Sequence, residues 1–256
     1  MPERHLNPGL AVSTLIVSMS DAHDPQHNHL LAALPPAERA RLYPRLQLVP
    51  MPLGMVLYES GDTQTHVYFP TDSIVSLRYV MPDGTSEEMS VVGNEGLIGV
   101  VLYLGGEPTP GRAIVQSAGH AYRLIGPQLK EEFDRNGEMQ LLLLRYTQVL
   151  ITQMAQIAVC KGHHSVDQQL CRWLLLSLDR LSSHQLTMTQ EFIATMLGVR
   201  RDDVTQAAGK LQELGIIHYA DGQITVVDRP KLEQLSCECY AVIKKESGRL
   251  LSLPRR

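Results

Sequence analysis

Residues 189–214 read TQEFIATMLGVRRDDVTQAAGKLQEL. Thr189 stands where a helix N-cap is expected, and Gly198 follows the first apolar-periodic segment as a turn residue. A second helix begins at Arg200 or Arg201, and its predicted buried face consists of Val204, Ala207, Ala208, Leu211 and Leu214. Two short helices joined across a glycine turn predict a helix-turn-helix unit.

The exposed face of the second helix offers the groups that read DNA. Guanidinium groups donate to guanine or phosphate, a carboxylate accepts from cytosine N4, and a carboxamide pairs with adenine. Asp202 and Asp203 also suit the positive end of a helix, so one of them has complementation of the helix dipole as an alternative role. The candidate DNA-binding residues are Thr189, Gln190, Arg200, Arg201, Asp202, Thr205 and Gln206.

A two-stranded wing is predicted after the second helix. Residues 215–219 and 223–227 are rich in β-branched and aromatic residues, and they flank the turn pair Asp221-Gly222. The order helix, turn, helix, wing predicts a winged helix-turn-helix domain over residues 163–230. A generic helical hairpin with a β-ribbon is the alternative, but caps, turn and wing agree on a DNA reader.

The region from Leu46 to Leu124 has a different character, because short β-type runs alternate there with Gly, Pro or Asp. Asp83-Gly84 is its clearest hairpin turn. These signals predict an antiparallel β-roll or sandwich, which we expect to form a sensor domain over residues 27–136. The expected strands lie at 56–58, 67–69, 74–80, 88–92, 113–115 and 121–124.

A long helix is predicted from Glu138 to Lys161, within a segment that we place at 137–162. Its apolar residues recur at alternating three- and four-residue spacing, which favours packing against a partner helix in a homodimer. A single buried core helix is the alternative. The predicted dimer interface consists of Leu144, Thr147, Ile151, Met154 and Ala158.

The composition sets the class of protein. With 256 residues, 44% of them hydrophobic, and a net charge of −4, the chain has the make-up of a soluble globular protein with one or two domains, each large enough to bury its own core. The charge argues against a protein that coats nucleic acid non-specifically. We expect residues 1–26 to be disordered, with 1–18 either disordered or added by an upstream start codon, and 231–256 to form a C-terminal helix or tail. The apolar run 10–19 is too short to span a membrane, so we expect a cytoplasmic protein.

Metal binding is not expected from the four cysteines, Cys160, Cys171, Cys237 and Cys239. Cys237 and Cys239 would need two further ligands, and no sequence neighbour supplies them. His163-His164 ends the long helix and is interpreted as a solvated hinge, with a metal site or a pH switch as the alternative. Without a secretory context the cysteines are expected to be reduced.

From about Leu30 to Val227 the chain resembles the Crp/Fnr family of transcription regulators. The resemblance implies an α+β protein: an antiparallel β-roll of the cyclic-nucleotide-binding type, a dimerisation helix and a winged helix-turn-helix. It also implies double-stranded DNA and RNA polymerase as partners, and an effector that the sequence does not identify. The segments that carry it are LYESGD at 57–62, GNEGLIG at 93–99, RWLLL at 172–176, TQE at 189–191 and RR at 200–201.

The effector pocket that the resemblance implies departs from the cyclic-AMP-binding pattern. Val100 stands where those members have a ribose-binding glutamate, and Ala113 follows Arg112 where they have a phosphate-binding serine. On the long helix Met154 replaces a base-binding hydroxyl residue. The tentative pocket residues are Gly99, Val100, Arg112, Ala113 and Met154. Because several hydrogen-bond partners are lost together, we expect that cyclic AMP is not the effector. The alternative is a cyclic-nucleotide- or cyclic-dinucleotide-gated regulator with a non-standard pocket.

Other cofactors and an enzymatic function are not expected. An iron–sulfur cluster of the family's N-terminal type is excluded, because no cysteine precedes Cys160. His66 and His120 are candidates for a heme ligand by location only and are interpreted as surface residues. No Ser/His/Asp array, P-loop or HExxH motif is present, so we expect a sequence-specific DNA-binding regulator that acts on a palindromic site. A helix-turn-helix that binds protein is the remaining rival.

Overall fold

The computed structural model describes residues 24–105, 108–181 and 185–251. The segment expected to be disordered, 1–26, lies mostly outside the described residues, and so does all of 1–18. Its last residues begin a short 3-10 helix, Pro25–His27, capped by the Asp24 side chain. Two short helices follow, α1 (His29–Ala32) and α2 (Pro36–Leu42), and a 3-10 turn, Tyr43–Arg45, leads into the sheets.

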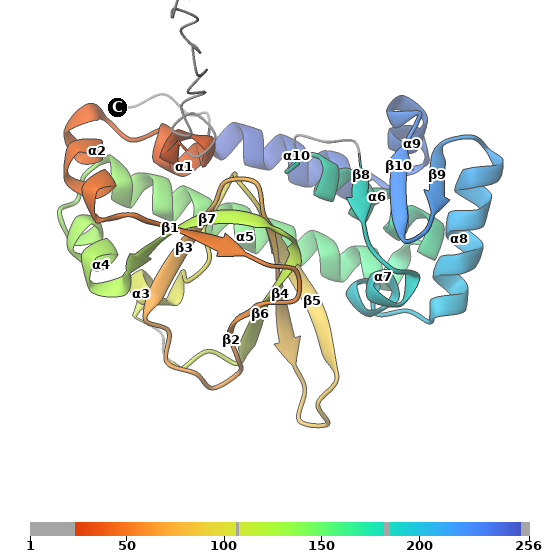
Figure 1. The fold of residues 1–256 in the computed structure, drawn as a ribbon, viewed down its shortest axis with the longest axis horizontal. Helices are drawn as coiled ribbons and strands as arrows, with labels where there is room; N and C mark the ends of the chain where they lie inside the picture. Colours follow the sequence, from red (N-terminus) through yellow and green to blue (C-terminus); the bar gives the residue numbers. More distant parts are fainter. Residues whose placement is uncertain (1–23, 106–107, 182–184, 252–256) are drawn as a thin grey trace, which may run out of the picture.

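Two antiparallel sheets form the N-terminal roll, as the strand and turn signals predict (Figure 1). The first has the order β1-β7-β3, with β1 at Gln47–Met51, β7 at Gly119–Ile125 and β3 at His66–Pro70. The second has the order β2-β6-β4-β5, with β2 at Val56–Tyr58, β6 at Gly111–Ser117, β4 at Ile74–Val80 and β5 at Ser86–Val92. Asp83-Gly84 lies in the turn between β4 and β5, where Gly84 has a φ of +84°. The predicted α+β class and hairpin are confirmed.

Strand β1 was not among the predicted strands, because Pro50 interrupts its apolar pattern. The structure shows why proline is tolerated there. Pro50 pairs with His120 of β7, and β1 is an edge strand, so the missing N–H need not serve a second neighbour. A one-turn helix, α3 (Val101–Leu104), was also not predicted.

Helix α5 (Glu138–His163) follows α4 (Gly126–Asp134) and runs along the length of the molecule (Figure 1). Its inner face closes the core of the roll. Tyr146, almost fully buried, donates its hydroxyl hydrogen bond to the Leu97 carbonyl at 2.9 Å. A Cβ at Gly96 would lie 2.3 Å from the Tyr146 ring, so only glycine fits this close approach. The long helix of the sequence analysis is therefore confirmed.

The C-terminal unit begins with α6 (Val166–Leu178), whose capping box of Ser165 and Gln168 forms as predicted. A three-stranded sheet in the order β8-β10-β9 accompanies α7 (Gln190–Leu197) and α8 (Arg201–Glu213). Its strands are β8 (Gln185–Thr187), β9 (Ile217–Ala220) and β10 (Gln223–Val226). The two predicted wing strands form as β9 and β10, and β8, a short strand before α7 that was not predicted, adds a third strand to β10.

One residue of the predicted buried face of α8 is exposed. Val204, Ala207, Ala208 and Leu211 are buried, but Leu214 is 52% exposed. Leu214 is the C-cap, after which the chain turns at Gly215 with a φ of +67°, so its side chain has left the packed face.

The last two helices are α9 (Arg229–Leu235) and α10 (Glu238–Leu251). Figure 1 shows α10 returning across the molecule along α5, so that the C-terminal helix spans both halves of the chain. A buried ion pair, Arg180 with Glu95 at 2.7 Å, joins the end of α6 to the roll. No helix among the described residues is long and apolar enough to cross a membrane.

Candidate nucleic-acid interface

Local signals place the reading helix. The Thr189 hydroxyl oxygen accepts the Phe192 backbone N–H at 3.2 Å, which caps α7 as predicted. Gly198 then adopts a φ of +72°, a conformation that favours glycine, and α8 begins two residues beyond Val199. These signals set the angle at which α8 leaves α7.

The exposed face of α8 divides into side chains that are engaged within the protein and side chains that are free to reach a ligand. Arg200 forms an ion pair with Asp203 at 3.0 Å, and this hydrogen bond lowers the pKa of the Asp203 carboxyl. The Thr205 hydroxyl donates to Gln190 Oε1 at 2.7 Å, which ties α8 to α7. The remaining candidates, Arg201, Asp202 and Gln206, are exposed. These three side chains are therefore the ones on this face that remain free to contact a ligand.

The wing and the neighbouring helices hold α8 in place. The Tyr219 backbone N–H donates to Gln212 Oε1 at 2.9 Å, and the Tyr219 hydroxyl donates to the Met188 carbonyl at 3.0 Å. Lys210 on α8 forms an ion pair with Asp167 on α6 at 2.8 Å. The contacts of Gln212 and Tyr219 were not predicted from the sequence. The available signal was a polar residue, Gln212, near the end of the second helix.

A cavity of about 240 Å³ lies between the roll and α5. Of the five tentative effector residues, Gly99, Val100, Arg112 and Met154 line it, whereas Ala113 is fully buried in the core of the roll. Residues that the sequence did not suggest complete the lining, among them Tyr58, Gln64, Arg78 and Tyr79.

The polar groups of this cavity suit a polar or anionic ligand. Within the described part of the chain, the buried Gln64 carboxamide has no hydrogen-bond partner at either end. Arg112 is held by Glu59, with Nε 3.3 Å from the carboxylate. Burial raises the pKa of Tyr58 to about 12, so its hydroxyl stays protonated and can donate.

Arg78 connects this cavity to the helix-turn-helix. It lines the cavity, and its Nη2 donates to the Ser86 carbonyl at 2.7 Å and to the Thr195 carbonyl of α7 at 3.2 Å. Burial lowers the pKa of Arg78 from its ordinary value, against the attraction of Glu88. Beside it, burial raises the pKa of Glu88 to about 6, although Ser76 donates to its carboxylate at 2.8 Å. Arg78 and Glu88 are therefore buried between the roll and α7, and for both groups the cost of desolvation exceeds the stabilisation by neighbouring charges.

The predicted dimer residues of α5 fall into two groups. Leu144, Ile151 and Ala158 are exposed, with Ile151 62% exposed. Thr147 and Met154 turn toward the roll instead: the Thr147 hydroxyl lies 2.8 Å from the Tyr103 hydroxyl, and Met154 lines the cavity. Leu141 and Val159 are exposed on the same helix. An apolar surface of α5 thus lies uncovered in a single chain.

Cys237 and Cys239 do have two further potential metal ligands beside them, so the reason for expecting no metal site there is wrong. Cys160 and His164 lie beside them. The four ligand atoms, one from each residue, all lie within 4.8 Å of one another. The proximity is hidden in the sequence because α10 must first fold back along α5. A local signal existed, since Cys160 and His164 are four residues apart and so share one face of a helix.

The His66 and His120 side chains are both partly exposed, as interpreted from the sequence. His66 lies 2.8 Å from the Thr65 hydroxyl through Nδ1, and His120 faces Asp72 at 3.4 Å. Each imidazole already has a polar neighbour at the surface.

Comparison with known proteins agrees with this fold. The model of the Crp-like helix-turn-helix domain matches residues 168–235. The search of curated proteins found no match.

Solved structures of similar fold cover the chain more fully. A Crp/Fnr-family regulator from Eubacterium rectale matches with a TM-score of 0.63 at 14% identity, over 82% of this chain and 98% of its own. FixK2 from Bradyrhizobium japonicum matches with a TM-score of 0.61 at 16% identity, over 75% and 98%. The c-di-GMP-responsive regulator CLP of Xanthomonas campestris matches with a TM-score of 0.56 at 14% identity, over 74% and 98%. Residues 168–235 therefore form a Crp-like helix-turn-helix domain, and the chain as a whole has the fold of the Crp/Fnr regulators.

Proposed function

We propose that this protein is a homodimeric, sequence-specific DNA-binding transcription regulator that acts on a palindromic site with half-sites about one helical turn apart. The observation that carries the proposal is the exposed set Arg201, Asp202 and Gln206 on α8, inside a Crp-like helix-turn-helix domain. Together these side chains offer a donor fork, an acceptor and a carboxamide to base edges in the major groove.

The uncovered apolar surface of α5 supports the homodimer. Leu144 and Ile151 are large, exposed and two turns apart, as expected for a helix that packs on a copy of itself. A two-fold pair of α8 helices then matches a two-fold DNA site. We propose the domain limits 27–136, 137–162 and 163–230, followed by a C-terminal segment 231–256.

Regulation by cyclic AMP is not part of the proposal. Val100 offers no carboxylate to a ribose hydroxyl, and Ala113 is buried away from the cavity, so it cannot stand in for a phosphate-binding serine. At about 240 Å³ the cavity is also smaller than typical ligand pockets, which begin at about 300 Å³. An effector would be a small polar or anionic molecule that pairs with Gln64, Arg78 or Arg112. A cyclic-nucleotide or cyclic-dinucleotide effector bound in another way is the alternative, and the fold likeness to the c-di-GMP-responsive regulator CLP favours testing it.

Arg78 provides the route by which such an effector would act. A ligand anion that pairs with Arg78 competes with the Thr195 carbonyl for the same guanidinium, and so alters the contact between roll and α7. The effect would be a shift in population between placements of α8 rather than a new fold.

A transcription regulator of this kind has an expected location, an expected partner and no need of catalysis. The protein would act in the cytoplasm, contact RNA polymerase at its target promoters, and have no catalytic activity. The fold is that of regulators, which supports a binding function over an enzymatic one.

Selection of bound sequences from a random pool of double-stranded DNA tests the proposal. We expect enrichment of a palindrome, with half-sites about 10 base pairs apart, and affinity that falls steeply with salt concentration as phosphate contacts are screened. Enrichment of no sequence, together with binding that is insensitive to salt, would favour the rival in which the helix-turn-helix binds protein.

A further inference from the structure

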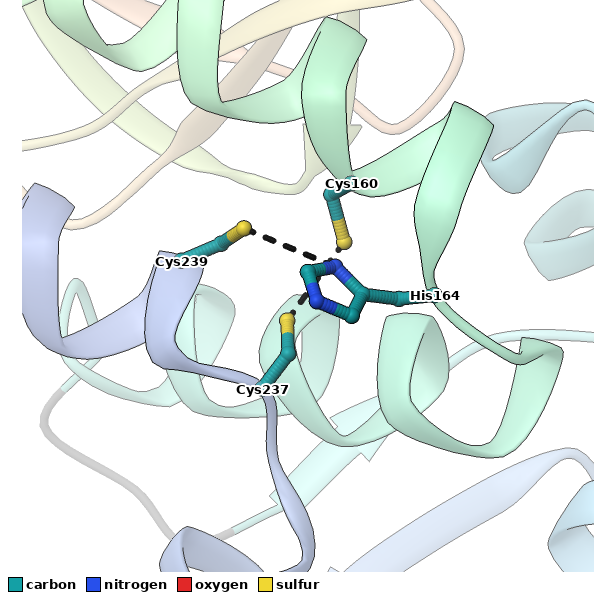
Figure 2. A group of neighbouring side chains, drawn as sticks. All are labelled: Cys160, His164, Cys237 and Cys239. Carbon is teal, nitrogen blue, oxygen red and sulfur yellow. Dashed lines mark hydrogen bonds between the residues drawn. The ribbon is translucent and has the colours of Figure 1, made fainter.

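Four side chains from distant parts of the sequence converge between α5, α6 and α10. We propose that Cys160, His164, Cys237 and Cys239 form a binding site for one zinc ion in each chain (Figure 2). The site is separate from the DNA-reading face and from the cavity of the roll.

The fold brings the ligands together in two pairs. Cys160 lies in the last turn of α5, and His164 is the C-cap of that helix, where its backbone N–H donates to the Cys160 carbonyl and holds the two residues together. Cys237 lies in the link between α9 and α10, and Cys239 lies in the first turn of α10. Because α10 packs along α5, the start of α10 lies against the end of α5. Figure 2 shows the four side chains pointing into one space.

The distances between the ligand atoms fit a single tetrahedral ion. Cys160 Sγ lies 3.5 Å from Cys237 Sγ, and Cys239 Sγ lies 3.7 Å from His164 Nδ1. A zinc ion with Zn–S bonds of about 2.3 Å has ligand atoms about 3.8 Å apart along the edges of its tetrahedron. All separations in the cluster are 4.8 Å or less, so small side-chain rotations would complete the coordination shell.

The ligand atoms lie in the interior, as structural zinc ligands do. The three cysteines are at most 4% exposed and His164 is mostly buried. Three sulfurs and one imidazole nitrogen form a closed four-ligand set, which leaves no position for a reacting water. Such a set is typical of a structural or regulatory zinc site and not of a catalytic one.

The groups around the cluster support the same assignment. Glu238 Oε1 lies 3.2 Å from His164 Nε2, so a carboxylate partners the ring nitrogen other than the Nδ1 that lies near Cys239 Sγ. This partner keeps the proton on Nε2 and leaves the Nδ1 lone pair for a metal.

Arg172 provides the matching charge. Its Nε donates to Cys160 Sγ at 3.2 Å, and the side chain is almost fully buried. Arg172 makes no direct ion pair among the described residues, although its charge also acts on the buried Glu88 carboxyl, and its guanidinium donates to a sulfur that would carry negative charge as a zinc ligand. Three thiolates around a zinc ion carry one negative charge in total, which Arg172 would balance.

Two other uses of the cysteines fit the geometry less well. An iron–sulfur cluster places several iron and sulfide atoms between its ligands, whereas here the sulfurs of Cys160 and Cys237 are nearly in contact. A disulfide between these two cysteines would leave Cys239, His164, Glu238 and Arg172 arranged around it without a role.

The position of the site suggests its consequence, which rests on the proposed function. Cys160 and His164 precede the first residue of α6, at the junction between the proposed dimer helix and the DNA-binding unit. A zinc ion would fix this junction to α10. Metal occupancy would therefore set the placement of α8, and loss of zinc would lower DNA affinity.

The test uses untagged full-length protein and measures zinc content by mass spectrometry, together with a competitive titration of the metal-free protein. We expect one zinc per chain and a Kd far below micromolar. His164→Gln and Cys239→Ser should each lower the affinity at least 100-fold. The matched controls are His163→Gln, an exposed neighbour, and Cys171→Ser, a buried thiol outside the cluster; both should keep the zinc.

Cobalt provides a second measurement on the unchanged protein. One equivalent of Co²⁺ should give the intense visible and charge-transfer absorption of a tetrahedral thiolate site, and zinc should displace it. Less than 0.2 equivalents of zinc or cobalt bound to the reduced wild-type protein would overturn the proposal, as would equal zinc affinity in His164→Gln and wild type. These readouts need no DNA, so a failed zinc site and a failed DNA-binding function are distinguished.

Discussion

Glu88 on β5 should make the protein less stable at neutral pH than at acidic pH. Its carboxyl is buried beneath the C-terminal unit, and burial raises its pKa from an ordinary 4.5 to about 6. Ser76, Arg172, Lys161 and Arg78 favour the charged form, but their combined effect is smaller than the cost of desolvation.

The size of the effect on the free energy of unfolding follows from the linkage between folding and proton binding. Because the pKa in the folded state is above that in the unfolded state, the group contributes stability that is fully present below pH 4.5. That stability is lost as pH rises through about 6. The difference between a pKa of 4.5 and one of about 6 corresponds to about 2 kcal/mol in the free energy of unfolding. Glu88→Gln keeps an acceptor for the Ser76 hydroxyl and removes the charge.

The assay is urea unfolding of wild type and Glu88→Gln at pH 5 and pH 8, with Glu87→Gln as a control from the exposed neighbouring position. We expect the variant to gain about 1 kcal/mol of stability relative to wild type between the two pH values, because part of the ~2 kcal/mol is already lost at pH 5. The other titrating groups cancel in the comparison. Glu87→Gln should show no such gain. A Glu88→Gln protein whose stability relative to wild type is the same at both pH values would refute the reasoning.

Four further predictions concern function. Arg201→Ala and Gln206→Ala should each reduce discrimination at one or two base positions by about 1–3 kcal/mol, measured by competition between specific and altered sites. The double change Leu144→Glu, Ile151→Glu should yield monomers in sedimentation and abolish tight binding to a full palindrome. Arg78→Met should change DNA affinity about 10-fold, as expected for the loss of one charged hydrogen bond to α7. Calorimetry should show no binding of cyclic AMP.

Controls and contrary outcomes separate these effects from general damage. Gln234→Glu, an exposed change on α9 and away from the apolar surface of α5, should leave the dimer intact. A stable dimer after the double change would mean that α5 is not the interface. Arg112→Met alters the same cavity without touching α7, so an equal effect of both arginine changes would argue against the Arg78 route. Equal loss on specific and random DNA would assign Arg201 and Gln206 to phosphate contacts. If cyclic AMP binds at micromolar concentration and raises DNA affinity, the alternative of a cyclic-nucleotide effector is correct.

Features that depend on a few neighbouring residues were predictable from the sequence. The Thr189 cap, the Ser165–Gln168 capping box and the turns at Asp83-Gly84 and Asp221-Gly222 depend on local backbone geometry, and all form. Asp221 and Gly222 both have positive φ, as a type I′ turn requires. Most strand positions followed from the same kind of signal.

Features that depend on long-range packing were not predictable. Pro50 is acceptable in β1 only because that strand is at an edge, and β8 becomes a strand only because β10 is beside it. The contact between Arg78 and Thr195 joins residues 117 positions apart, and that between Cys160 and Cys237 joins residues 77 apart. No periodicity or turn signal reports such pairs.

The contacts between roll and C-terminal unit differ in strength, and the difference bears on how α8 could move. Arg180 and Glu95 are buried together, so removing either partner would leave an uncompensated charge at a cost of about 3–5 kcal/mol. Lys161 and Glu87 form a more exposed pair, which is worth about 1 kcal/mol or less. Arg78 contributes one long hydrogen bond to α7. The end of α6 is therefore held firmly while α7 is held weakly. A ligand that displaced Arg78 would weaken the contact of α7 with the roll by about 1.5–3 kcal/mol, whereas α7 and α8 would stay packed on α6 in their shared hydrophobic core.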